Sequence, residues 1–325
     1  MNSKKCVFCN SNNLIKYGKQ NDKVRWKCKD CGKIFQANTR KNPLNREGLF
    51  FSFVFGKQNI SELALSYHIR KSKVQQEFDA YILPEKIHRP REVNLVVDGT
   101  YFNSNNEENE FCLIVFRDEK NKEDLWWKFC DTERESYYRE GLIYLESLGY
   151  IIKSVTADGL SLIRRAFNEI PYQTCLVHVM HGVQRKTTKN PILAAGKDLL
   201  DLSKVIFTTD EKVFIKLLLG YKRKYIDFLN ERVTSEITGN SWYVHKELRE
   251  GFLHLYNAYR HMHTYLKDRD NIPRTSNSIE GHFKQIKIRV SVHHGLSIKR
   301  KQKLLETILL NSSVKLVDNR IRSGY

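Results

Sequence analysis

The pattern of hydrophobic and polar positions changes character at Arg91. From there the runs "EVNLVVDGTYF", "FCLIVFRDE" and "LWWKFCDT" are rich in β-branched and aromatic residues and predict three strands. The runs that follow predict a helix in "RESYYREGLIYLESLGY", a strand in "IIKSVTADG", a helix in "LSLIRRAFNEI" and a strand in "YQTCLVHVM". This order, β-β-β-α-β-α-β over residues 91–181, predicts a mixed α/β fold in which helices cover a mixed sheet.

Residues 182–273 show few strand signals and repeat their apolar positions at helical spacing, which predicts an all-helical insertion. Residues 274–325 then return the chain to the sheet as final helices with a basic C-terminal segment. Within "TSNSIEGHFKQIKIRV", Asn277 is expected to cap a helix and Glu280 to complete a capping box. The apolar residues of this helix form one stripe, Ile279, Phe283, Ile286 and Val290. Taken alone, this stretch is typical of a capped surface helix.

Residues 44–90 predict three helices, the last two short and joined by a brief turn. Such a pair indicates a helix-turn-helix, although an ordinary helical hairpin is the alternative because no residue is diagnostic. The polar residues that open the expected recognition helix, and that we expect to contact DNA, are Arg70, Lys71, Ser72, Lys73, Gln75 and Gln76.

Residues 1–43 contain four cysteines in two C-x2-C pairs that are separated by eighteen residues: Cys6, Cys9, Cys28 and Cys31. Each pair can direct two thiolates at one ion, so the spacing predicts a zinc ribbon with one structural Zn²⁺. Disulfides are the alternative, but a reducing cytosol disfavours them. We expect that compartment because the chain shows neither a membrane span nor the apolar core of a signal peptide.

The chain has 325 residues and a formal net charge of +18, which is unevenly distributed. Residues 1–91 hold 19 lysines and arginines against 7 acids, and residues 274–325 hold 11 against 3. The middle is nearly neutral, with 25 against 27. A merely soluble lysine-rich protein would carry a uniform surplus, so two basic ends indicate a polyanionic partner such as DNA.

Two carboxylates follow hydrophobic runs of the expected sheet. Asp98 ends the first predicted strand and Asp158 the fourth, and a glycine comes next in both cases. Asp-Gly is also a favoured turn pair, which explains one of them more easily than both. If these strands are neighbours, the two acids can share a divalent ion, and a third acid is then required from outside the sheet.

The ordered set of Asp98, Asp158, "CLVH", a helical insertion and "RTSNSIEGHFKQIKIRVSVHHGLS" resembles the DDE transposases of bacterial insertion sequences, Mutator-like superfamily, zinc-ribbon subgroup. The resemblance implies a ribonuclease-H-like catalytic core and the catalytic triad Asp98, Asp158 and Glu280. It also implies that Cys175 and His178 form a C-x2-H signature. Three acids can hold two Mg²⁺ or Mn²⁺ ions for cleavage and strand transfer.

The resemblance implies further that the chain binds element terminal repeats and target DNA, acts as a homo-oligomer on paired ends, and is nucleoid-associated in a bacterial cytoplasm. Lys284, Lys287 and Arg289 are then expected to contact phosphates. The alternative function is a zinc-ribbon and helix-turn-helix DNA-binding regulator whose ribonuclease-H-like core is inactive. A nuclease without strand transfer is a third possibility.

Three further expectations depend on the predicted elements. Cys175 and His178, three apart on a strand, should point to opposite faces, which makes them poor joint metal ligands and favours a structural role near the site. Trp242 of the insertion either stacks on an extruded base or belongs to the core. Asp118 and Asp131, near the ends of the second and third strands, are substitutes if the strands align differently.

Overall fold

The computed structural model describes the chain except for residues 1–4, 7, 21–22, 37–43, 104–108 and 313–325. The last thirteen residues of the predicted basic C-terminal segment therefore lie outside the described part. The chain divides into two units, one of Met1–Ser52 with Ile60–Tyr81 and one of Phe53–Asn59 with Ile82–Tyr325. In the described part, every helix is too short or too polar to cross a lipid bilayer.

The first unit begins with a three-stranded antiparallel sheet, formed by β1 (Leu14–Gln20), β2 (Lys23–Cys28) and β3 (Ile34–Gln36). The register pairs Leu14 with Cys28. The stretch between the two cysteine pairs is thus a hairpin, and β3 extends it.

Three short helices follow in the chain, as predicted: α1 (Arg46–Phe55), α2 (Ile60–Ser66) and α3 (Lys71–Ala80). Leu63 of α2 and Val74 and Phe78 of α3 are buried. The Phe50 ring stacks on the rings of Phe78 and Tyr81, with centroid distances of 5.3 and 3.8 Å. These aromatic contacts fix the two longer helices against each other.

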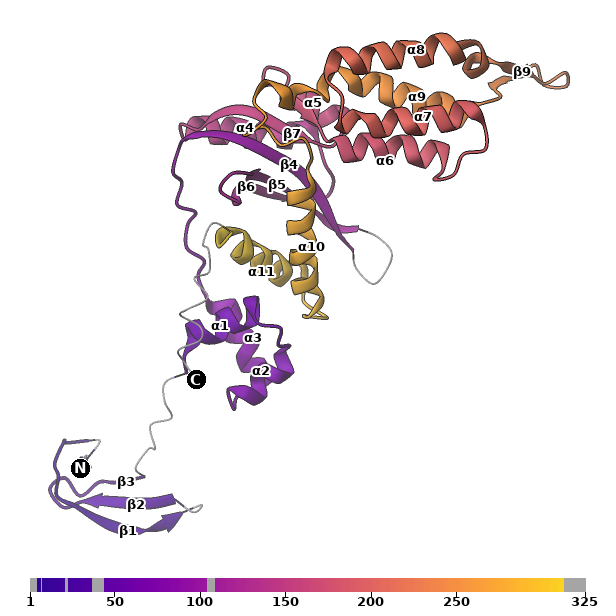
Figure 1. Cartoon of the computed structure of the whole chain (residues 1–325). Helices are drawn as coiled ribbons and strands as arrows, with labels where there is room; N and C mark the ends of the chain where they lie inside the picture. The colour runs from indigo at the N-terminus through magenta and orange to yellow at the C-terminus, as the bar shows by residue number, and fades with distance from the viewer. Residues whose placement is uncertain (1–4, 7, 21–22, 37–43, 104–108, 313–325) are drawn as a thin grey trace. The chain divides into compact units, whose positions relative to one another are not determined.

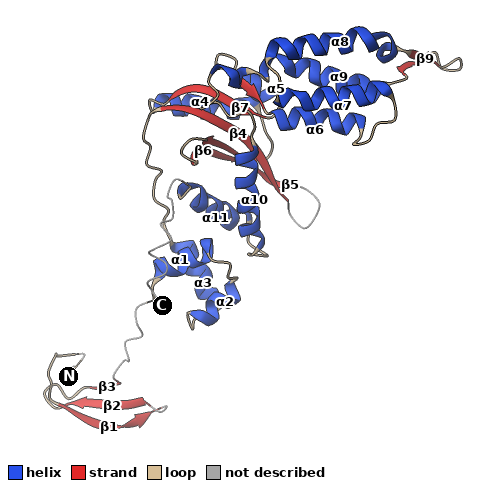
Figure 2. Cartoon of the chain, in the orientation of Figure 1, coloured by secondary structure: helices blue, strands red, loops and turns tan. Residues whose placement is uncertain are grey.

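The second unit is built on a five-stranded mixed sheet with the order β6-β5-β4-β7-β8. The strands are β4 (Glu92–Asn103), β5 (Asn109–Asp118), β6 (Glu123–Cys130), β7 (Ile151–Ala157) and β8 (Tyr172–Thr174). The first three are antiparallel, and β7 and β8 are parallel to β4. This arrangement confirms the predicted mixed α/β core (Figure 2).

The pairing of β4 with β7 contains one irregularity. Val93 pairs with Ile152 and Asn94 with Ser154, so Lys153 is an extra residue in β7, a β-bulge. Pairing is regular beyond it and ends with Val96 opposite Thr156.

Helices cover both faces of the sheet, as Figure 1 shows. On one face α4 (Glu135–Ser147) and α5 (Ser161–Ala166) enclose a core that includes Leu95, Val97 and Tyr138. On the other face lie α10 (Asn277–Ser291) and α11 (Ile298–Leu310). The predicted apolar stripe of α10 is buried at Ile279, Phe283 and Ile286 and half-buried at Val290. Because side chains alternate along a strand, Val96 and Asp98 point to the α10 face.

The predicted strand "YQTCLVHVM" is wrong in its second half. β8 ends at Thr174, and α6 (Leu176–Thr187) begins at once. Cys175 is the junction, because its N–H donates to the carbonyl oxygen of Ala157 in the sheet (2.8 Å) while its own carbonyl accepts from Val179 in the helix (3.1 Å).

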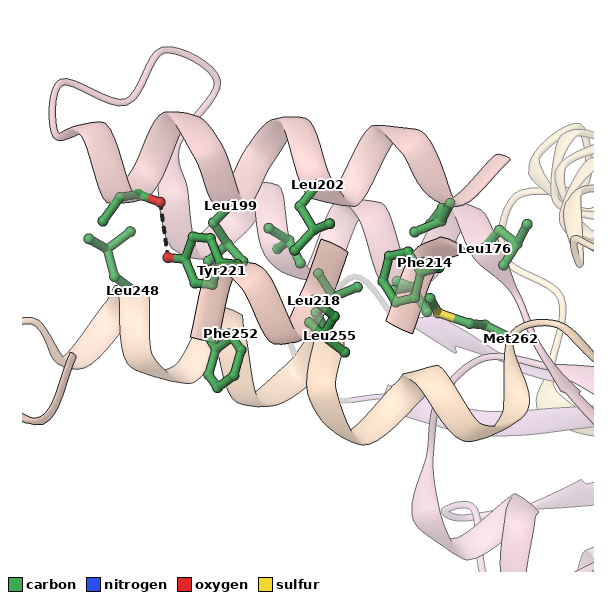
Figure 3. Packing of buried hydrophobic residues seen from close by; sticks show 14 of the residues in the cluster. Leu176, Leu199, Leu202, Phe214, Leu218, Tyr221, Leu248, Phe252, Leu255 and Met262 are labelled. Atoms are coloured by element: carbon green, nitrogen blue, oxygen red, sulfur yellow. Dashed lines mark hydrogen bonds between the residues drawn. The ribbon is translucent and has the colours of Figure 1, made fainter. Parts of the chain in front are cut away.

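The insertion is helical as predicted, except for one hairpin. Its elements are α7 (Ala194–Lys204), α8 (Glu211–Asn230), α9 (Lys246–Ala258), short 3-10 turns at Val205–Phe207, Tyr259–His261 and Thr264–Lys267, and the strands β9 (Arg232–Thr234) and β10 (Ser241–Tyr243). Buried leucines and aromatic residues of α6 to α9 form one core, shown in Figure 3. Leu176 belongs to it, so α6 joins the sheet to the helices.

Candidate active site

Asp98 and Asp158 lie level with each other on neighbouring strands. Each is two residues beyond the last parallel pair, Val96 with Thr156, and therefore points to the same face as that pair. Asp158 follows the end of β7 as predicted. Asp98, however, lies inside the twelve-residue β4, which continues to Asn103 beside β5; the prediction that it ends its strand is wrong.

The two aspartates repel each other in a poorly solvated place. Burial, with the charge of Asp158 added, raises the pKa of Asp98 to about 8. Burial also raises the pKa of Asp158, and the charge of Glu280 contributes. Their hydrogen bonds within the site come from the N–H groups of Gly99 (2.9 Å) and Leu160 (3.0 Å). Such an incompletely compensated acid pair, with hard oxygen donors, fits a divalent cation.

Glu280 lies in the first turn of α10, whose N-cap is Ser276 and not the predicted Asn277. The Ser276 N–H donates to Cys175 Sγ (3.2 Å), so it cannot close the expected capping box with Glu280. Instead, the Ser276 hydroxyl donates to Glu280 Oε1 (3.0 Å). Glu280 is thus held by its own helix turn and by the junction between the sheet and α6.

Cys175 and His178 lie on the same side of α6, not on opposite faces, because this segment is a helix and not a strand. His178 Nδ1 is 3.3 Å from Ser276 Oγ and 3.8 Å from Glu280 Oε1. A hydrogen bond with Cys175 raises the pKa of His178 to about 9. Burial opposes ionisation of the Cys175 thiol, but hydrogen bonds from His178 and Ser276 outweigh it and lower its pKa.

A groove of about 520 Å³ runs between β4 and α10. Asp98 and Glu280 both line it, together with two exposed lysines of α10, Lys284 and Lys287. Arg289 is not among the lining residues; its guanidinium donates to the carbonyl oxygen of Phe55 (3.1 Å) and lies over the ring of that residue. The structure therefore brings two of the three predicted phosphate-binding side chains to the acids.

The carboxylates of Asp98, Asp158 and Glu280 are neighbours, but they are not arranged as a closed ligand set. In the part of the chain that the structure describes, two groups have ligand atoms within 4.8 Å of one another. One is the group of four cysteines, and the other combines Cys175, His178 and Glu280. Glu280 Oε1 is directed at Ser276 and His178, so it would have to turn to share an ion with both aspartates.

Glu133 is a fourth acid of this region that the sequence analysis missed. Its carboxyl lies against Gly99, where an added Cβ would be only 2.6 Å from Glu133 Cδ. Tyr138 donates a hydrogen bond to it, and burial, with the charge of Asp158 added, raises its pKa. The glycine after Asp98 indicates room for a side chain from elsewhere in the chain, but it does not indicate which side chain.

The suggested substitutes do not reach the groove. Asp118 is buried at the other end of β5, where Arg91 binds it at 2.6 Å, and Asp131 is exposed. Among the histidines of the insertion, His263 is buried, and its ring nitrogens have no hydrogen-bond partner.

Two contacts tie α10 to the start of β6 and to the turn that precedes it. His282 Nε2 lies 2.7 Å from Asp124, a fully buried carboxylate that also pairs with Arg117. One turn earlier, the Ser278 hydroxyl donates to Glu119. These contacts set the position of the helix that carries Glu280.

The four N-terminal cysteines converge within the first unit. Cys6 Sγ lies 3.6 Å from Cys31 Sγ, and Cys9 Sγ lies 3.6 Å from Cys28 Sγ. All four thiols are free, and the separations suit four ligands of one tetrahedral ion. The group could therefore hold zinc.

The predicted DNA-contacting residues of the helix pair are mostly on the surface. Arg70, at the N-cap of α3, and the side chains of Lys71, Ser72, Lys73 and Gln76 are exposed, and Gln75 is half-buried. Lys73 also pairs with Glu77 at 2.6 Å. In the second unit, Trp242 is 51% exposed on the β9–β10 hairpin, so the core alternative for this residue is wrong.

Comparison with known proteins yields only distant likenesses. No family model and no curated protein matches the chain. Among solved structures it is similar to the integrase catalytic core domain of HTLV-2 in complex with magnesium, at 17% identity and a TM-score of 0.22, over 47% of this chain and 95% of that one. It is also similar to the simian T-cell lymphotropic virus intasome in complex with PP2A regulatory subunit B56 gamma, at 12% identity and a TM-score of 0.21, over 61% and 74%.

Proposed function

We propose that this chain is a DNA transposase of the DDE type, which binds the terminal repeats of a mobile element and catalyses metal-dependent strand cleavage and strand transfer. The observation that carries the proposal is the β4–β7 register. In it Asp98 and Asp158 are level on one face of the sheet, and Asp98 lines a groove with Glu280 and two lysines of α10.

Each side chain has a role in this proposal. Asp98, Asp158 and Glu280 would hold two Mg²⁺ or Mn²⁺ ions, and Glu280 turns from Ser276 to do so. The ions, when bound, supply the Lewis acidity that in-line displacement at phosphorus needs. Lys284 and Lys287, four and seven residues beyond Glu280, lie on its side of the helix and bind phosphates of the strand in the groove.

The other parts supply DNA recognition in this proposal. The zinc ribbon with one Zn²⁺ and the opening of α3 contact the terminal repeats, and target DNA enters the groove after the first cut. The surplus of lysine and arginine over acidic residues in residues 1–91 and 274–325 favours DNA binding that weakens as the salt concentration rises. The active form would be a homo-oligomer on paired ends, on the nucleoid of a bacterial cytoplasm.

A cleavage assay on DNA that carries the repeats flanking the coding region tests the proposal. We expect Mg²⁺-dependent cutting and joining that falls roughly 100-fold or more in Asp98→Asn, Asp158→Asn and Glu280→Gln. Asp131→Asn is the matched control, since this exposed acid lies outside the groove, and it should cut normally. Full activity of Glu280→Gln would refute the site.

A DNA-binding regulator with an inactive core is the second candidate. The observation in its favour is that Glu280 Oε1 is engaged by Ser276 and does not complete a ligand set with the aspartates. This function predicts repeat binding without any divalent-ion-dependent nicking, unchanged by Asp98→Asn.

A further inference from the structure

The side chains of Cys175, His178 and Glu280 meet at the start of α10. Of the three, the proposed metal-dependent reaction uses Glu280 alone. Cys175 is the N-cap of α6, His178 follows within the first turn, and Glu280 comes from another helix. One ligand atom of each lies within 4.8 Å of the other two. This is compatible with one ion binding all three after small side-chain shifts.

The backbone holds this meeting point in place. The Leu176 N–H donates to the carbonyl oxygen of Arg274 (3.1 Å), and the Ser276 N–H donates to Cys175 Sγ (3.2 Å). Thr156 of β7 donates to the carbonyl oxygen of Pro273 (2.8 Å). The segment before α10 is therefore fixed to the sheet and to α6, and the hydrogen bond from the Ser276 N–H orients the Cys175 sulfur.

The chemistry of the three donors differs from that of the aspartates. A sulfur, an imidazole nitrogen and a carboxylate oxygen suit Zn²⁺ and similar borderline ions, with a fourth position open. Mg²⁺ prefers oxygen ligands alone. Cys175 is fully buried, whereas the side chains of His178 and Glu280 are 33% and 42% exposed, so an ion can enter from their side.

We propose that Cys175, His178 and Glu280 form a second cation site, selective for zinc-class ions, and that an ion there holds Glu280 away from Asp98 and Asp158. The binding site stands on its own contacts, whereas the effect on Glu280 rests on the proposed transposase function. Glu280 would have to turn away from Ser276 and His178 to reach both aspartates, and an ion shared with His178 and Cys175 opposes that turn. Occupancy by zinc therefore opposes occupancy of the aspartate site by magnesium.

The zinc content of the full-length chain, measured by elemental analysis after equilibration with Zn²⁺, tests the site directly. We expect about two ions per chain, one at each cysteine-containing group. Cys175→Ser and His178→Ala should each lose one. Cys112→Ser is the matched control, because Cys112 is equally buried but lies in the sheet, and it should keep both.

A spectroscopic measurement supports the count. Co²⁺ added to the chain after its four-cysteine group is filled with zinc should give the absorbance of tetrahedral cobalt with a thiolate ligand, lost in Cys175→Ser. Serine still offers an acceptor to the Ser276 N–H, so this variant should fold. Equal zinc content and equal cobalt absorbance in the wild type and both variants would overturn the site.

The effect on Glu280 is measured by adding Zn²⁺ to Mg²⁺-dependent cleavage. Zinc should slow cleavage by the wild type and by Cys112→Ser. At the same zinc concentrations, Cys175→Ser should cleave as fast as it does with Mg²⁺ alone. If zinc binds at Cys175 but does not inhibit, the competition is refuted. If the chain binds two zinc ions but shows no Mg²⁺-dependent cleavage, the proposed function is contradicted instead and the cation site stands.

Discussion

At the scale of single residues, the energetics of the candidate site depend most on Asp98. Its pKa of about 8 exceeds the usual value of about 4 because burial and the neighbouring Asp158 disfavour its charge. The folded chain then binds more protons than the unfolded chain between these values. By linkage, the folded state loses stability as the pH rises through that window.

Asp98→Asn should remove this loss. In magnesium-free buffer we expect the free energy of unfolding of the wild type to fall by on the order of 2 kcal/mol between pH 5 and pH 8, and that of the variant to fall less. Urea unfolding at both pH values measures the difference. Asp131→Asn, an exposed acid, should behave as the wild type. Identical pH dependence of Asp98→Asn and the wild type would contradict the burial of an uncompensated charge.

At the scale of elements, α10 depends on its attachment to the start of β6. His282→Ala would leave Asp124 fully buried with Arg117 as its remaining charged partner, at a cost of about 2 kcal/mol, because a hydrogen bond to a buried charge is lost. His181→Ala is the control, since His181 is exposed on α6. Urea unfolding compares them, and equal losses would show that the contact does not hold the helix.

The elements also show what the sequence can predict. The strands and helices from β4 to α5 were predicted because their hydrophobic periods differ clearly and turn residues separate them. The run "CLVHVM" was assigned to a strand because a short apolar run has no period of its own. Only the tertiary bonds of Cys175, to Ala157 on one side and Val179 on the other, decide where strand becomes helix.

The residues of the candidate site also differ in whether the sequence points to them. Asp158 and Glu280 could be singled out because each stands at an end of its element, whereas Asp98 was singled out by a strand end that the structure places at Asn103. Glu133 could not be singled out, because its place beside Gly99 depends on how the segment before α4 packs. The β9–β10 hairpin was missed since its strands have three residues each, too few for alternation to be read.

At the scale of the whole molecule, the chain consists of two units that each have their own contacts. The four-cysteine group lies in the first unit and the sheet with α10 in the second. Loss of the ribbon's ion should therefore unfold the ribbon alone, because such small domains depend on their metal for folding.

Cys9→Ser tests this independence. Hydrogen exchange followed by mass spectrometry should show lost protection in residues 14–36 and unchanged protection in β4 to β7. Treatment of the wild type with a zinc chelator should reproduce the pattern. Faster exchange in β4 or β7 would show that the second unit depends on the ribbon.

The bulge at Lys153 has a consequence for comparisons between sequences. Ile152 and Ser154, the neighbours of Lys153, pair with consecutive residues of β4. The pairing of β4 with β7 therefore does not need Lys153. A chain with one codon fewer at this point would keep Asp158 level with Asp98. An alignment to a chain with a regular strand must therefore open its gap at residue 153, or the two aspartates will fall into different columns.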